Sequence, residues 1–132
     1  MAEIKRIKPQ ELQNHKDIIR INKSSIHVNV VVATGKEGDF FVSISPSLNV
    51  SGYGKTKRES MESFSENMEV FCSDLMTLPR KRIEIELRNV GFKKEKMQHK
   101  NFSKVYVDEN GILQNFEEGS LETNMLKATT PA

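Results

Sequence analysis

The residues Gly54-Lys55-Thr56 have the order that ends the phosphate-binding loop of many nucleoside triphosphatases. In such a loop, a glycine five residues before the Gly-Lys-Thr lets the backbone amides curl around the phosphates. Position 49 of this chain is asparagine instead. Thr56 followed by Glu59 is also the pattern of a capping box, which starts a helix. The sequence therefore predicts a helix start here, with no nucleotide site and no cofactor.

Other residue types that support catalysis do not form a local constellation. His15, His27 and His99 lack the spacing of metal ligands, so no metal site is predicted. The single cysteine, Cys72, follows Phe71 and is interpreted as a small buried side chain. We therefore predict a protein that is not an enzyme. A hydrolase would require the fold to bring acidic groups, or Cys72 and a histidine, together in a cleft.

The strongest binding signal is a basic segment, residues 92–106, in which lysines are interleaved with apolar and aromatic residues. Residues 79–104 hold nine basic and three acidic side chains, a balance of +6. Lysines can hold a phosphate backbone while aromatic rings stack on bases. The alternative is that the rings anchor a loop whose lysines stay in water. The candidate contact residues for nucleic acid or another partner are Lys93, Lys94, Lys96, Lys100, Lys104 and Phe102.

Alternating apolar residues predict three strands before the helix. Residues 26–33 alternate with a period of two, and one side of that strand is formed by Ile26, Val28, Val30 and Val32. Gly35, Gly38 and Asp39 then predict a hairpin loop. Residues 40–45 are a second strand, in which Phe40, Val42 and Ile44 alternate with Phe41 and Ser43. Pro46 interrupts the pairing before a third short strand, residues 48–53.

The helix that Thr56 starts has one apolar stripe about six turns long and ends at Pro79. The stripe consists of Met61, Phe64, Met68, Phe71, Leu75 and Leu78. Residues 83–87 alternate apolar and charged side chains and predict a fourth strand. Asn110-Gly111 suits the turn of a C-terminal β-hairpin. Residues 1–25 are expected to form either a short helix, with Leu12, Ile18 and Ile19 inward, or a disordered arm, and residues 121–132 to be frayed.

The resulting order, β-β-β-α-β, predicts an α+β fold with a small antiparallel sheet and one long helix on one face. Three segments follow: an N-terminal arm (1–25), the β-β-β-α-β domain (26–90), and a basic loop with a hairpin and an acidic tail (91–132). No apolar run approaches the roughly 20 residues that cross a bilayer, so no membrane association is expected. The absence of a signal-like apolar stretch and the single cysteine favour the cytoplasm.

Residues 28–71 resemble the N-terminal domain of HicB-type antitoxins, a partial ribonuclease H fold, and the match extends to about residue 87. The similarity runs through Gly38-Asp39-Phe40, Val42, Ile44, Pro46 and Leu48, and it ends with Gly54, Thr56, Glu59 and Ser60 at the helix start. This resemblance implies a non-catalytic protein that forms homo-oligomers and neutralises a small ribonuclease toxin by binding it. The chain departs from the family in two features. Residues 45–49 lack the family's acidic residue and glycine, and no helix-turn-helix pattern follows Leu87.

Overall fold

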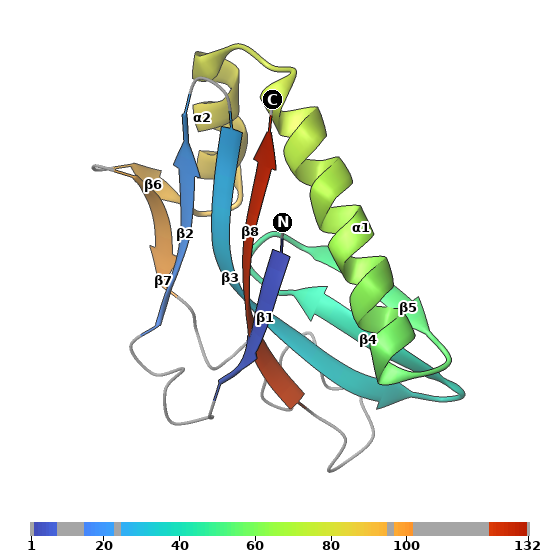
Figure 1. The fold of residues 1–132 in the computed structure, drawn as a ribbon. Helices are drawn as coiled ribbons and strands as arrows, with labels where there is room; N and C mark the ends of the chain where they lie inside the picture. Colours follow the sequence, from blue (N-terminus) through green and yellow to red (C-terminus); the bar gives the residue numbers. More distant parts are fainter. Residues whose placement is uncertain (1, 8–14, 23–24, 95–96, 102–121, 132) are drawn as a thin grey trace.

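The structure is a computed structural model that describes residues 2–7, 15–22, 25–94, 97–101 and 122–131. Along this part of the chain the elements are β1 (Ala2–Arg6), β2 (Lys16–Ile21), β3 (Ser25–Glu37), β4 (Phe40–Ser45), β5 (Val50–Gly54), α1 (Lys57–Met76), α2 (Arg80–Asn89), β6 (Lys93–Lys94), β7 (Gln98–Asn101) and β8 (Glu122–Pro131). They form one antiparallel sheet with two helices, so the predicted α+β class is confirmed (Figure 1).

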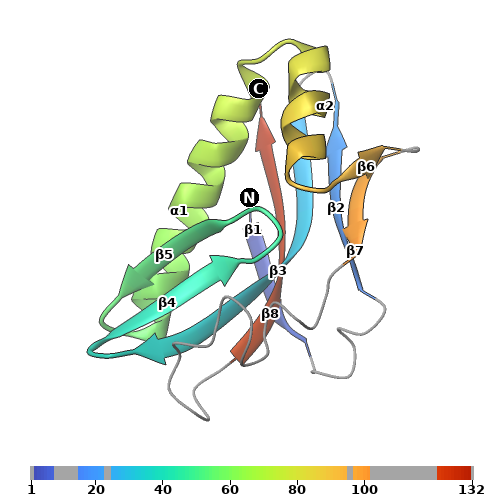
Figure 2. The same ribbon diagram turned by 180° about the vertical axis from the view of Figure 1, so that it is seen from behind.

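The sheet is organised around the long strand β3, in the order β1-β8-β3-β2-β7-β6. One edge of β3 pairs with β8 from Ser25 to Thr34. The other edge pairs with β2 over Ile26–Asn29 and then, from Ala33 onward, with β4. The hairpin of β4 and β5 therefore continues the far end of β3 and turns away from β2 (Figures 1 and 2).

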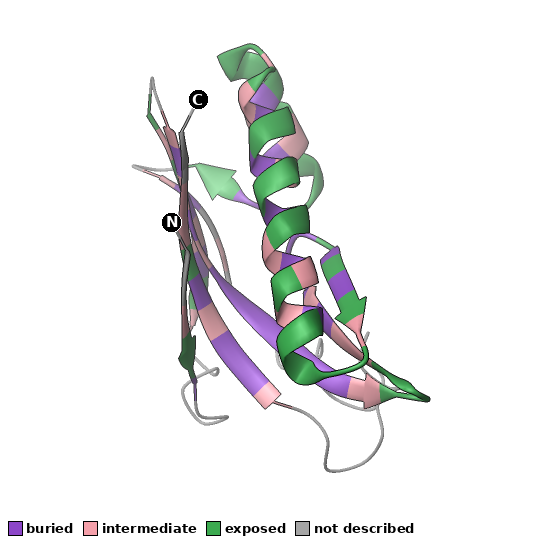
Figure 3. Ribbon diagram, turned by 45° about the vertical axis from the view of Figure 1, so that its right-hand side comes forward, coloured by how far each residue is buried: buried purple, intermediate pink, exposed green. Residues whose placement is uncertain are grey.

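Helix α1 packs on the sheet chiefly over β5 and β4, and its buried residues face the strands (Figure 3). The predicted capping threonine is confirmed, because Thr56 is the N-cap and its side chain accepts a hydrogen bond from the Glu59 amide. The predicted alternation of β3 is confirmed from Ile26 to Val30, whereas Val31, Val32 and Ala33 are all buried, so both faces of the strand are covered there. The core consists mainly of Ile26, Val28, Val30, Val32, Phe64, Met68, Cys72, Leu75, Ile83, Leu87, Phe92 and Leu126.

Small residues on β4 and β5 form the surface beneath the first half of α1. The hydroxyl of Ser43 lies 2.7 Å from that of Thr34 and 2.9 Å from that of Ser60 on α1. A Cβ atom added to Gly52 would lie 2.6 Å from the Cα of Phe64, so helix and strand are in direct backbone contact. Phe40, Val42 and Ile44 alternate with Ser43 and lie on the opposite face, where Phe40 makes an edge-to-face contact with Tyr53.

The fourth predicted strand is wrong, because residues 80–89 form the helix α2. Ile83 and Leu87 are four residues apart and both buried, whereas Ile85 between them is exposed. An apolar-charged alternation of only three apolar residues fits either a strand or a short helix. The segment consists mainly of Arg, Lys, Glu and Leu, which are good helix formers, and it follows Pro79, which is the N-cap. Both features favour the helix.

Both flanking segments contribute strands that the sequence did not predict. Residues 16–21 are β2 rather than part of a helix or a disordered arm, and residues 122–131 are β8 rather than a frayed end. Ile19 is fully buried, in agreement with its predicted inward position, but it reaches the core from a strand. The predicted hairpin around Asn110-Gly111 lies outside the described residues.

Candidate functional site

The Gly-Lys-Thr stretch has the geometry of a helix cap. Thr56 Oγ1 accepts from the Glu59 amide at 3.1 Å, and Glu59 Oε2 accepts from the Lys55 amide at 2.7 Å. A Cβ atom on Gly54 would lie 2.9 Å from the Ser60 nitrogen, so this glycine permits close packing against the helix. The Lys55 amide, which a phosphate-binding loop would use, is thus occupied by the protein's own Glu59 side chain.

Replacing Thr56 with alanine is expected to lower the free energy of unfolding by about 1 kcal/mol, because the Glu59 amide loses its acceptor. Thr56→Ser keeps the hydroxyl and should stay close to the wild type. Urea unfolding followed by circular dichroism measures both. A Thr56→Ala protein as stable as the wild type would contradict the capping role.

The predicted lysines have different environments in the structure. Lys94 forms an ion pair with Glu84 on α2. Lys100 donates from its ammonium group to the carbonyl of Val90, at the C-terminal end of α2, at 2.6 Å. Lys93 is exposed on β6. Lys96, Lys104 and Phe102 lie outside the described residues, so the predicted patch stays a prediction.

The ion pair between Lys94 and Glu84 has an electrostatic consequence. The hydrogen bond from the Lys94 ammonium, and then the positive charges of Lys94, Arg80 and Arg88, lower the pKa of Glu84, while desolvation opposes the shift. The carboxylate form of Glu84 is thus favoured by cations from both ends of α2 and from β6.

A buried carboxylate that the sequence did not single out lies where the edge of β3 passes from β2 to β4. Asp17 is fully buried, and its Oδ1 accepts from the Val31 amide at 3.1 Å. The same oxygen lies 2.8 Å from Nε2 of His15. Val31 lies in the stretch of β3, residues 30–32, between the part that pairs with β2 and the part that pairs with β4. Asp17 therefore supplies a side-chain acceptor where the backbone ladder is interrupted.

The described residues hold no group of three or more His, Cys, Asp and Glu side chains that could bind a metal ion. Cys72 is buried in the core, as predicted for a small apolar side chain. Neither helix of the described chain is both long and apolar enough to span a membrane.

An apolar groove lies between the end of α1 and the second half of α2, with a volume of about 410 Å³. We call it the interhelical groove. Its apolar lining is Phe71, Leu75, Leu78, Leu87 and Val90, and its polar lining is Asp74, Thr77 and Glu86. The predicted stripe supplied three of these residues as core positions. The groove itself depends on residues 80–89 being a helix, so the predicted strand there concealed it.

Comparisons of the chain with protein-family models, with curated proteins and with solved structures give no match. The resemblance to HicB-type antitoxins therefore stays a prediction that rests on the residues quoted for it, and functional inference depends on the geometry of the described surface.

Proposed function

We propose that this chain is a non-catalytic protein-binding module, comparable to a HicB-type antitoxin, that binds a small basic protein through the interhelical groove. The observation that carries the proposal is the combination of an apolar groove with an acidic border. The partner is expected to insert an apolar side chain between α1 and α2 and to place basic groups around it.

The apolar lining can supply binding energy. Val90 is 37% exposed, and Phe71 and Leu78 are half-buried at the groove. Covering one large apolar side chain of a partner is worth roughly 1.5–3 kcal/mol. Interfaces commonly depend on a few such anchors in well-packed pockets.

The charged residues around the groove favour a partner with a positive net charge. Asp74 and Glu86 line it, and none of its described lining residues is basic. Glu62, Glu66 and Glu69 are exposed along the same helix α1. Complementary charge accelerates encounter and disfavours partners of the same sign, so this surface fits a basic protein such as a small ribonuclease.

Two further expectations belong to this proposal. Self-association would use the open edge of β5, which pairs only with β4 among the described strands, and the exposed Phe40 and Tyr53 beside it. Nucleic-acid binding through residues 92–106 is the alternative. It has weaker support, because the ammonium groups of Lys94 and Lys100 are bound within the protein.

The test is co-expression with the toxin-sized basic protein that we expect to be encoded beside this chain, followed by calorimetric titration of the purified pair. Val90→Lys places a cation in the groove and should weaken binding at least tenfold. Val70→Lys is the matched control, because Val70 is exposed on α1 and does not line the groove.

Equal affinity of the Val90→Lys and Val70→Lys proteins would exclude the interhelical groove as the contact surface. Failure of the neighbouring protein to co-purify with the wild type would count against the antitoxin-like function itself. Light scattering of the chain alone and of the complex gives the stoichiometry.

A further inference from the structure

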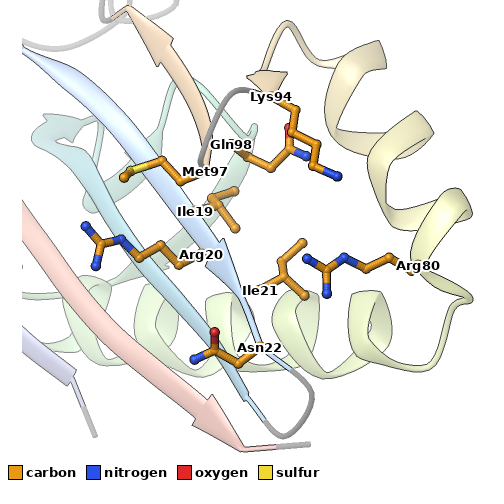
Figure 4. A pocket seen from close by; sticks show the side chains of 8 residues that line it. All are labelled: Ile19, Arg20, Ile21, Asn22, Arg80, Lys94, Met97 and Gln98. Atoms are coloured by element: carbon orange, nitrogen blue, oxygen red, sulfur yellow. The ribbon is translucent and has the colours of Figure 1, made fainter.

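Both helices pack into the core on one side of the sheet, and we call the other side the open face. Successive residues of a strand point to opposite faces, so the strand registers decide which residues share the open face. In Figure 4 the side chains of Ile21 and Gln98 point toward α2, whereas that of Arg20 points away from it, to the open face. The exposed cations of this face are Lys5 on β1, Lys16 and Arg20 on β2, Lys93 on β6 and Lys127 on β8.

Most of these cations are not neutralised within the described chain. Those that form neither a hydrogen bond nor an ion pair with any described residue are Lys16, Arg20, Lys93 and Lys127. On the side of the helices, in contrast, Arg6 pairs with Glu122 and Lys94 pairs with Glu84. On the open face Glu3 lies opposite Lys127 in the pairing of β1 with β8. The uncompensated positive charge therefore lies mainly on β2 and β6.

The cations are spread across the open face rather than gathered at one point. From Lys5 on β1 to Lys93 on β6 there are five strand spacings, which amount to about 24 Å. Arg20 is two strand spacings and two residue positions away from Lys93, and equally from Lys127, so roughly 12 Å separates the Cα atoms of either pair. An array of this width matches a polymer that carries a negative charge on every unit, and no small anion can span it.

His27 places an aromatic ring among these cations. Its Nδ1 lies 2.8 Å from the hydroxyl of Thr129, and its Nε2 lies 3.2 Å from the hydroxyl of Ser25. The ring is half-buried and lies directly opposite Arg20 in the pairing of β2 with β3. A ring that is held at both nitrogens beside a guanidinium group is suited to stack on an unpaired base.

The apolar residues of the open face do not suit a membrane surface. Ile18 on β2 and Met125 on β8 are only half-buried. The exposed large apolar side chains of the described chain lie on β4, β5 and the helices or directly after α2, and none lies on the strands that carry the cations. Surfaces that bind to lipid insert such side chains between the head groups. The open face therefore fits a nucleic acid better than a membrane.

We propose that the open face binds single-stranded nucleic acid. Lys16, Arg20, Lys93 and Lys127 contact phosphates of the backbone, and the ring of His27 stacks on a base. RNA and DNA strands both present this chemistry. The inference does not rest on the protein-binding proposal, because the interhelical groove lies on the other side of the sheet. It also differs from contact through residues 92–106, because most of the contact residues lie outside that segment.

The test is fluorescence polarisation of the full chain with a labelled single-stranded RNA dodecamer, and with the DNA of the same sequence, at several salt concentrations. Four neutralised phosphates predict that log K falls with log salt concentration with a slope of about −2.8. Lys16→Gln and Arg20→Gln should each weaken binding at least threefold and make the slope shallower by about 0.7. Lys81→Gln and Arg88→Gln remove the same charges from exposed positions of α2 and should change affinity less than twofold.

The comparison of the two strands decides the source of the ligand. A preference of at least tenfold assigns the open face to that nucleic acid, and a smaller one assigns it to single strands of both kinds. The proposal is overturned if neither strand binds, if Lys16→Gln and Arg20→Gln bind like the wild type, or if the α2 variants weaken binding as much. It is also overturned if polyglutamate, or vesicles that contain phosphatidylserine, bind as tightly as the nucleic acid.

Discussion

Replacing Gly52 with alanine is expected to lower the free energy of unfolding by about 3 kcal/mol or more. The added Cβ would lie 2.6 Å from the Cα of Phe64 and from the carbonyl carbon of Ser63, and closer still to the Phe64 nitrogen. All three are backbone atoms of α1, so no side-chain rotation can relieve the overlap. The helix must move as a body and lose packing of Phe64 and Met68, which are almost fully buried.

The matched control for this substitution is Gly38→Ala. Gly38 has a φ of +61° in the turn between β3 and β4, and a Cβ there meets no atom within 4 Å. Its cost is restricted to backbone strain of about 1–2 kcal/mol. Thermal unfolding should place Gly52→Ala about 10 °C or more below the wild type. A strand glycine without a close neighbour is usually stabilised by alanine, so unchanged or increased stability would show that α1 does not lie against β5.

Replacing Asp17 with alanine is expected to cost about 2–4 kcal/mol of folding stability, because it removes a buried acceptor. The Val31 amide loses its acceptor and His15 Nε2 loses its contact with the carboxylate, and neither β2 nor β4 pairs with β3 at Val31. Asp17→Asn keeps one oxygen at nearly the same place and should lose much less. Urea unfolding of the three proteins measures the difference.

Asp39→Ala serves as the control for removing an aspartate, because Asp39 is exposed in the β3–β4 turn. A change within about 0.5 kcal/mol is expected there. If Asp17→Ala were no more destabilising than Asp39→Ala, the Asp17 carboxylate would not be the acceptor that completes the edge of β3. Amide hydrogen exchange at Val31 should accelerate in Asp17→Ala and stay slow in Asp17→Asn.

The parts of the fold that the sequence predicted correctly are those specified by neighbouring residues. Thr56 and Glu59 are three residues apart, so the capping pattern is visible without knowledge of the rest of the chain. The alternation of Val28, Val30 and Val32 has the same local character. In contrast, β8 is a central strand whose partners, β1 and β3, lie about a hundred residues or more earlier in the chain. No pattern within residues 122–131 predicts that pairing.

The candidate sites could be predicted less well than the fold, because they are assembled from distant segments. Arg20 and Lys127 come to one face only after β3 pairs with both β2 and β8. The lysine-rich segment, residues 92–106, was predicted as a contact surface because of its high density of positive charge. Density alone cannot show that Lys94 pairs with Glu84 and that Lys100 binds backbone carbonyls.

The pairing of β1 with β8 also bears on how the protein is made. In this strand pair Arg6 contacts Glu122, 116 positions later in the sequence, and β1 has no other strand partner among the described residues. During translation, the backbone of residues 2–6 therefore has no strand to pair with until residues 122–131 have left the ribosome. The central strand β3 likewise keeps one edge open for that whole interval, a circumstance in which a nascent chain depends on chaperones to avoid aggregation.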